Sequence, residues 1–164
     1  HDEIQFFTVY SIRIIDVTEV YYCATMITRY SILHNEDPEF AWMRKKADPG
    51  DMDRKKRAVR LCHEAGIPVC ASTDANTPFV RPGDVLKEIA LYTECGLTNL
   101  EAIQTATRDA ARLCMIEKDT GTLEPGKRAD FVILSGNPLE DIHMLEKVDS
   151  TWSGGACIYK GVEE

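Results

Sequence analysis

The chain has 164 residues, and its 27 acidic residues outnumber its 19 basic residues, which gives a formal net charge of −8. This balance argues against a partner such as nucleic acid or an anionic membrane, because both attract basic surfaces. Hydrophobic residues make up 44% of the chain, which is typical of a globular protein with about one domain. Because its apolar runs are far shorter than about 20 residues, we expect no transmembrane helix. We expect no signal peptide, since no basic region precedes an apolar one.

Two apolar runs predict neighbouring strands near the start of the chain. Partial alternation over residues 4–17 predicts one strand, and the continuous run over residues 20–27 predicts a strand buried on both faces, as in a parallel sheet. A polar loop is expected to follow as far as Pro49 and Gly50. Residues 67–72 form another short apolar run that predicts a strand.

Helical patterns separate and follow these runs. Helices are expected over residues 51–65 and 84–95, and Thr98 with Glu101 forms a capping box that begins a third helix. The basic cluster at residues 54–57 is interpreted as a solvated helix face. The residues predicted to face inward are Ala58, Leu61, Cys62, Ala65, Val85, Ile89, Thr93, Leu100 and Ile103, with Ala106 or Thr107.

The last part of the chain has the pattern of a small β module. Residues 124–127 (EPGK) predict a turn, and residues 131–134 predict a strand. Residues 148–152 and 156–159 are predicted to pair through Gly154 and Gly155. The order of elements therefore predicts β/α units around a parallel sheet, followed by short strands.

Six cysteines and four histidines are spread along the chain. Since no two cysteines form a C-x-x-C pair, we expect six reduced thiols, buried or half-buried, in a reducing and cytoplasmic compartment. The histidines include no H-x-H motif and no pair at the spacing of a zinc-binding helix. We expect His34 in a solvated loop and His63 on a solvated helix face.

Asp74 follows directly after the apolar run 67–72. In β/α architectures the chemistry is found at the carboxyl ends of the strands, and a carboxylate there can bind a metal or act as a base. An aspartate after a strand is also a common cap or turn former. Position alone leaves both interpretations open.

Four segments carry a resemblance to a known family: residues 66–75 (GIPVCASTDA), 96–113, 121–134 and 137–142. In this order they resemble the amidohydrolase superfamily, in its imidazolonepropionase-like and prolidase-like branch. The resemblance implies an α/β fold, a partial (β/α)8 TIM-type barrel reduced to its last two β/α units and followed by the C-terminal strands of a small β-sandwich domain.

The same resemblance implies an organisation of the chain and a chemistry. Residues 1–19 are unassigned, residues 20–120 are the C-terminal part of the barrel, and residues 121–164 are strands of the small composite β domain. The activity implied is hydrolysis of an amide or cyclic amide C–N bond by water activated on a divalent metal, commonly zinc. The substrate implied is a small amide or a dipeptide-like molecule.

The resemblance also implies roles for individual residues. Asp74 matches the aspartate of the last barrel strand, which binds metal and transfers a proton to the leaving nitrogen. Tyr30 and Asn76 are candidate substrate-binding residues, together with Thr25 and Arg29. Structural roles are implied for Asp130 and for the turn at Pro125 and Gly126.

Other features of the family are missing from this sequence. The H-x-H motif is absent, and His1 is either a remnant of the last metal histidine or an incidental residue. A barrel of this type takes about 250 residues, and the chain begins with His1 rather than Met. We therefore expect a C-terminal fragment that is inactive alone. The alternative is a non-catalytic binding or split-enzyme subunit, whose partner is the missing N-terminal half or a second copy.

Overall fold

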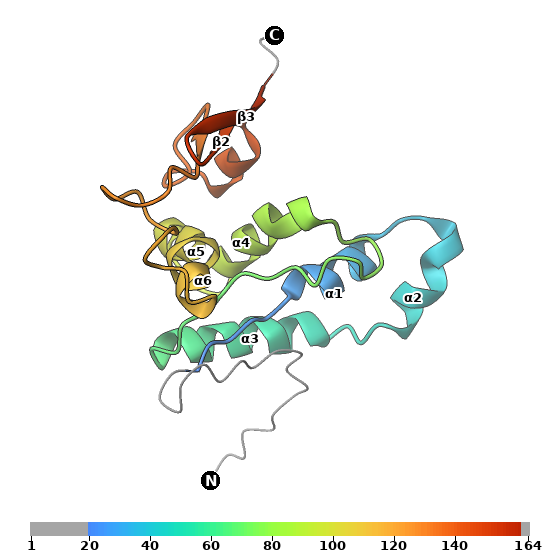
Figure 1. The fold of residues 1–164 in the computed structure, drawn as a ribbon. Helices are drawn as coiled ribbons and strands as arrows, with labels where there is room; N and C mark the ends of the chain where they lie inside the picture. The colour runs from blue at the N-terminus through green and yellow to red at the C-terminus, as the bar shows by residue number, and fades with distance from the viewer. Residues whose placement is uncertain (1–19, 162–164) are drawn as a thin grey trace.

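The computed structural model, which describes residues 20–161, combines short helices with a three-stranded sheet in an α/β fold (Figure 1). The sheet lies at one end of the molecule and the helix α3 at the other, with α4, α5 and α6 between them. In chain order the elements are α1 (Met26–His34), η1 (Pro38–Phe40), α2 (Ala41–Lys46), α3 (Asp51–Glu64), η2 (Pro82–Asp84), α4 (Val85–Thr93), α5 (Asn99–Ala106), α6 (Arg108–Leu113), β1 (Phe131–Leu134), η3 (Ile142–Glu146), β2 (Val148–Ser153) and β3 (Ala156–Lys160).

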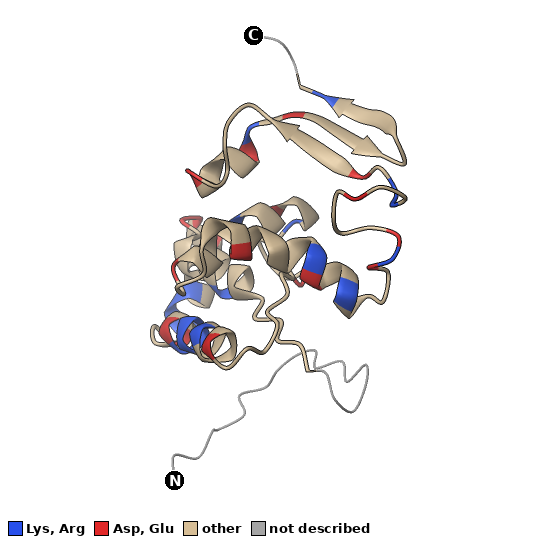
Figure 2. Ribbon diagram, turned by 90° about the vertical axis from the view of Figure 1, so that its left-hand side faces the viewer, with Lys and Arg blue, Asp and Glu red and all other residues tan. Residues whose placement is uncertain are grey.

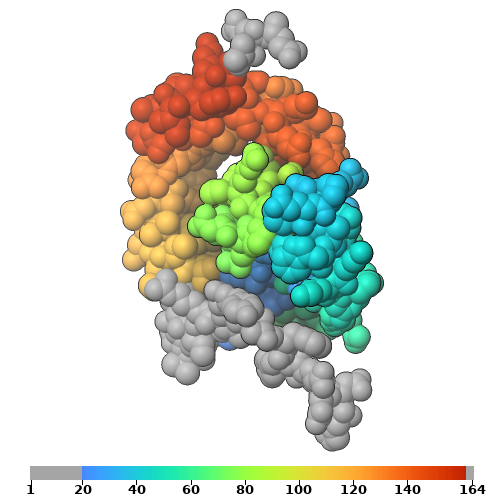
Figure 3. Space-filling model, turned by 90° about the vertical axis from the view of Figure 1, so that its right-hand side faces the viewer, coloured from blue at the N-terminus to red at the C-terminus, as the bar shows by residue number. Residues whose placement is uncertain are grey.

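The core lies where α1 packs against α3 and α4. Ile27 of α1 and Val59 of α3 are fully buried there, and so is Tyr92 of α4. The 3-10 helix η3 joins the same core through Ile142 and Leu145, so the sheet is attached to the helices by apolar contacts. Leu134 of β1 packs against the same core, and Asn99 of α5 donates hydrogen bonds to the carbonyls of Pro138 and Leu139. Figure 3 shows an opening between the green α4 region and the orange sheet region.

The structure corrects the predicted strand over residues 20–27. Tyr22 forms a parallel bridge with Val69, so the parallel pairing is confirmed, but the extended segment is short and α1 begins at Met26. The helix starts there because the buried carboxylate of Glu88 accepts hydrogen bonds from its first backbone N–H groups. The predicted strand over residues 4–17 and the position of His1 lie outside the described residues.

The loop predicted before Pro49 is also wrong in part, because it contains η1 and α2. Asp37 begins η1 by accepting a hydrogen bond from the backbone N–H of Glu39 at 2.9 Å. His34, predicted in a loop, is the last residue of α1, although its side chain is exposed as expected.

The helices themselves form close to their predicted bounds, but the predicted inward faces of α3 and α5 are only partly correct, since Cys62 and Ile103 pack against the core whereas Leu61 and Leu100 are exposed. On α3 the buried residues are Met52 and Val59, whereas Leu61 is 52% exposed. This face turns inward because it packs against α1 and because Arg60, beside Val59, reaches the carbonyl of Cys95 at the end of the α4 region. Ala65 is likewise exposed.

On α5 the buried residues are Ala102 and Thr105, and the predicted inward residue Leu100 is 50% exposed. Ile103 packs against the core as predicted. The capping box is confirmed, since Thr98 and Glu101 exchange side-chain to backbone hydrogen bonds.

The sheet has the order β1-β2-β3 with antiparallel pairing throughout, as the predicted turns require. Gly154 and Gly155, with φ of 58° and 81°, form the tight turn between β2 and β3, a conformation that favours glycine. The carboxylate of Asp130 accepts the Gly154 N–H at 2.8 Å and pairs with Arg128, which gives Asp130 a structural role. Figure 2 shows few charged residues on the sheet and both signs of charge along α3.

The cysteine prediction is correct for four residues and wrong for two. All six thiols are free, but Cys114 and Cys157 are exposed rather than buried. In the described part of the chain, no helix is long and apolar enough to cross a membrane.

Gly121 allows a close approach between the loop after α6 and α6 itself. Its φ is 94°, and an added Cβ atom would lie 2.4 Å from the Cβ of Ala111 and 3.0 Å from the carbonyl oxygen of Thr107. We expect Gly121→Ala to lower the free energy of unfolding by about 2–4 kcal/mol, combining overpacking with an unfavourable φ. Denaturant unfolding measures this, with Gly83→Ala as the control because nothing lies near its Cβ position. Equal loss in the two variants would contradict the prediction.

Candidate functional site

The candidate site lies at the carboxyl ends of the two extended segments. The Tyr22 N–H donates to the Pro68 carbonyl and the Cys70 N–H donates to the Tyr22 carbonyl, both at 2.9 Å. Because the segments are parallel, the residues that follow them leave on the same side. A pocket of about 490 Å³ opens there, with Asp74 and Thr25 in its wall.

The backbone at these ends has an unusual conformation. Thr25, Asp74, Asn76 and Phe79 have φ of 45°, 50°, 81° and 68°. Positive φ is uncommon for residues other than glycine, and such residues cluster at functional sites. Two of these four residues, Thr25 and Asp74, lie in the pocket wall, which supports its choice as the candidate site.

Charged side chains from α1 and α3 complete the pocket wall. Arg29 Nε lies 2.5 Å from Asp51 Oδ2, so α1 and the start of α3 are joined by an ion pair. Lys55 reaches from α3 toward the pocket, and its Nζ donates to the carbonyl oxygen of Ala24 at 2.9 Å. Burial lowers the pKa of Lys55, although the nearby Asp51 opposes this shift.

Glu88 holds the start of α1 next to the pocket residue Thr25, a role that the sequence did not predict. It is fully buried on α4, and its two carboxylate oxygens accept the backbone N–H groups of Met26 at 2.9 Å and Ile27 at 2.6 Å. Lys55 binds the carbonyl of Ala24, before Thr25, and Glu88 binds the backbone N–H groups that follow Thr25. The backbone is therefore held on both sides of Thr25. Its burial could have been inferred from its position among the apolar residues of the helix, since Glu88 lies beside Ile89 and one turn before Tyr92.

Burial raises the pKa of Glu88 above its usual range, although hydrogen bonds from Tyr92, Met26 and Ile27 oppose the shift. The folded state therefore binds this proton more tightly than the unfolded chain. The associated stability is fully present below the unfolded pKa and is lost as the pH rises through the folded pKa. We expect the unfolding free energy of the wild type, relative to Glu88→Gln, to decrease as the pH rises above about 4.3. Urea unfolding at a series of pH values measures this difference, and a constant difference would contradict it.

The structure separates the predicted site residues. Asp74, Thr25 and Arg29 line the pocket. Tyr30 lies elsewhere on α1, where its ring stacks on His34 with centroids 4.0 Å apart and packs against the core. Asn76 is exposed and lies outside the pocket wall. The substrate-binding roles of Tyr30 and Asn76 stay predictions.

The described residues do not by themselves fit a complete metal centre. A catalytic zinc site typically has three protein ligands, and no group of three His, Cys, Asp or Glu side chains suited to a metal occurs within residues 20–161. Among the described residues, Asp74 contributes one carboxylate to the pocket wall.

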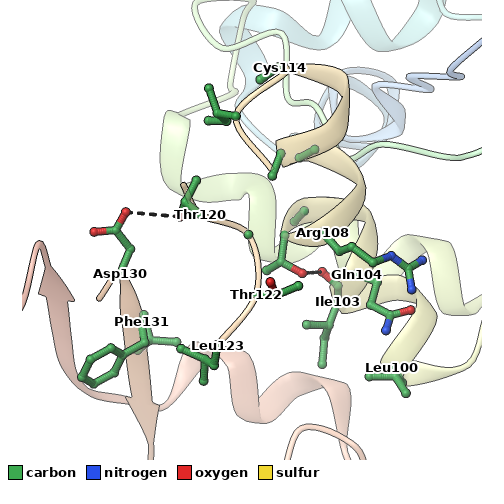
Figure 4. Close-up of a pocket in the computed structure, with 17 residues that line it drawn as sticks. Leu100, Ile103, Gln104, Arg108, Cys114, Thr120, Thr122, Leu123, Asp130 and Phe131 are labelled. Carbon is green, nitrogen blue, oxygen red and sulfur yellow. Dashed lines mark hydrogen bonds between the residues drawn. The ribbon is translucent and has the colours of Figure 1, made fainter. Parts of the chain in front are cut away.

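A second pocket, of about 630 Å³, lies between α5, α6 and β1 (Figure 4). Leu100, Ile103 and Leu123 contribute to its mainly apolar wall. At its rim Thr120 donates a hydrogen bond to Asp130 at 3.3 Å. Asp74 does not line this pocket, so we keep the first pocket as the candidate site.

Comparison with known proteins identifies the class of protein that this fold defines. Residues 17–158 match the model of the amidohydrolase family. The chain belongs to this family.

Individual relatives agree with the family. Ochratoxinase from Aspergillus niger is 32% identical over 114 residues, which cover 66% of this chain and 23% of the relative. Imidazolonepropionase from Shouchella clausii is 32% identical over 109 residues, covering 63% of this chain and 24% of the relative. The chain thus spans about a quarter of the length of the curated relatives that it matches.

Solved structures are likewise similar to this chain over only part of their own length. A Xaa-Pro dipeptidase with bound methionine in its active site superposes with a TM-score of 0.71 at 33% identity, covering 86% of this chain and 34% of that chain. The A. niger ochratoxinase structure has a TM-score of 0.67 at 28% identity, with coverage of 86% and 32%.

Proposed function

We propose that this chain forms the C-terminal part of an amidohydrolase barrel. Residues 20–120 would supply the last two β/α units, and residues 121–164 would supply strands of a small composite β domain. The parallel pairing of Tyr22 with Val69 supports this assignment, because neighbouring barrel strands are parallel. The partial coverage of the solved structures supports it as well.

The activity that we propose for the assembled protein is hydrolysis of an amide or cyclic amide C–N bond. The observation that carries this proposal is the position of Asp74 in a pocket at the carboxyl ends of two parallel segments. A carboxylate there can accept a proton from the attacking water and pass it to the leaving nitrogen. The names of the relatives, a Xaa-Pro dipeptidase and an imidazolonepropionase, support a dipeptide-like or cyclic amide substrate.

We propose that Asp74 is also one ligand of a divalent metal, with zinc as the preferred ion. Since the described residues offer no complete ligand set, the chain alone should bind zinc weakly and show no turnover. The purified chain can be tested by metal analysis and by an assay with a Xaa-Pro dipeptide. Stoichiometric zinc together with turnover would overturn this expectation.

The alternative is a subunit that works only with a partner. It is favoured by β3, whose residues are all exposed, with Ile158 at 65% and Tyr159 at 53%. Size-exclusion chromatography can test the chain with the part of A. niger ochratoxinase that precedes the matched segment. A 1:1 complex that gains zinc and turnover supports a split enzyme, whereas a metal-free complex without turnover supports a binding subunit.

A further inference from the structure

Two cysteines lie side by side on the neighbouring extended segments. The parallel bridge joins Tyr22 to Val69, and Cys23 and Cys70 are the residues that follow. Residues one step beyond a bridged pair are neighbours and point to the same face. Neighbouring strands are about 4.8 Å apart, which is within the Cα separation of about 4.4–6.8 Å found in disulfides.

The two thiols have different surroundings. Cys70 is fully buried, whereas Cys23 is half-buried and lines the pocket that contains Asp74. A hydrogen bond from Cys70 lowers the pKa of the Cys23 thiol, and the same contact, together with burial, raises the pKa of Cys70. Cys23 is therefore the reachable thiol with more thiolate character, and Cys70 is its protonated neighbour.

The remaining cysteines lack this combination. Burial raises the pKa of Cys62, and it raises the pKa of Cys95 to about 11. Cys95 also points inward, where its Sγ donates to the carbonyl of Leu91 at 3.4 Å. Cys114 and Cys157 are exposed, on the loop after α6 and on β3.

We propose that Cys23 and Cys70 are a site of reversible oxidation, where reaction with a hydroperoxide forms an intramolecular disulfide. In the first step the Cys23 thiolate attacks the O–O bond of the hydroperoxide. An S–O bond forms, the O–O bond breaks, and the departing alkoxide or hydroxide takes up a proton, leaving a sulfenic acid on Cys23.

In the second step the sulfur of Cys70 attacks the sulfenyl sulfur of Cys23. The S–S bond forms, the S–O bond breaks, and the departing oxygen leaves as water with the proton of Cys70. Overall the two thiols lose two electrons and two protons, and the hydroperoxide is reduced to water and an alcohol, or to water alone. A dithiol reductant reverses the change by thiol–disulfide exchange.

The disulfide would join the two extended segments where the candidate site begins. The free thiol of Cys23 in the pocket wall would become a disulfide sulfur bonded to Cys70. The proposal rests on the register of the segments and on the two thiols, so it stands whether or not the hydrolytic activity proposed above is correct.

The test uses the full chain with the exposed thiols removed by Cys114→Ser and Cys157→Ser. One molar equivalent of hydrogen peroxide is added, free thiols are alkylated, and the protein is digested and mapped by mass spectrometry. We expect a mass loss of two hydrogen atoms, located in a cross-link between Cys23 and Cys70 and removed by dithiothreitol. The same treatment in guanidinium chloride should lose this selectivity, because the unfolded chain no longer places the two thiols together.

Two variants in the same background sharpen the result. With Cys70→Ser, the oxidation should stop at a sulfenic acid on Cys23 that dimedone traps, whereas Cys62→Ser should leave the cross-link unchanged. The proposal is overturned if the folded chain gives no link between Cys23 and Cys70, or if the main product joins another pair. The cross-link mapping uses a folded chain that keeps both Cys23 and Cys70. Its result therefore tests the proposal whether or not Cys70→Ser folds.

Discussion

Replacing Glu88 with alanine should lower the free energy of unfolding by about 3 kcal/mol or more. The variant removes a fully buried carboxylate and leaves the backbone N–H groups of Met26 and Ile27 without their acceptor. Each unsatisfied buried donor costs about 1–3 kcal/mol, and the missing side chain leaves a cavity as well. Chemical denaturation at neutral pH, followed by circular dichroism, measures the loss.

Glu94 provides the matched control for this measurement. It follows the last turn of the same helix, but its side chain is 51% exposed and pairs with Lys56 at 2.6 Å. Exposed ion pairs contribute less than about 1 kcal/mol, so Glu94→Ala should be mild. A loss in Glu88→Ala that is no larger than in Glu94→Ala would contradict a structural role for the buried carboxylate.

The second large effect is expected on catalysis. For the hydrolysis proposed above, Asp74→Asn should lower kcat by at least about 100-fold, since a positioned acid–base group typically contributes a factor of about 100 to 10,000. Asparagine keeps the size of the side chain but cannot take up the proton of the attacking water. Steady-state kinetics on the complex of this chain with the part of A. niger ochratoxinase that precedes the matched segment would measure the change.

Asp119→Asn is the control for Asp74→Asn. Asp119 is exposed on the loop between α6 and β1, away from the candidate pocket. This substitution should leave kcat unchanged within about twofold, in keeping with the small effects of surface substitutions. Near-normal turnover of Asp74→Asn would remove Asp74 from the proposed mechanism.

Both expectations depend on contacts between distant parts of the chain. Glu88 holds the start of α1 from a position 61 and 62 residues away. Asp74 shares its pocket with Thr25, and the segments that precede these two residues are joined by the bridge between Tyr22 and Val69. Asp74 was recognisable because it ends an apolar run within a family-like motif. The supporting residues Glu88 and Lys55 belong to no such motif. Charged residues on a helix are usually solvated, so the position of Glu88 among apolar residues was the one weak indication of its burial.

The sequence by itself determined the features that arise from neighbouring residues. The capping box of Thr98 and Glu101 joins residues three apart, and the turn between β2 and β3 needs only the positive φ of Gly154 and Gly155. The bounds of β1 were also predicted correctly. Such interactions act over a few residues, so local chemistry was sufficient to predict them.

The tertiary structure decided what the sequence pattern left ambiguous. Met26 and Ile27 belong to a β-rich apolar run, yet a distant carboxylate makes them the first turn of a helix. On α3, which packs against α1, Val59 is buried and Leu61 is exposed. In each case burial and hydrogen bonding to partners far along the chain outweigh local propensity, because they contribute more free energy than the small preferences of single residues.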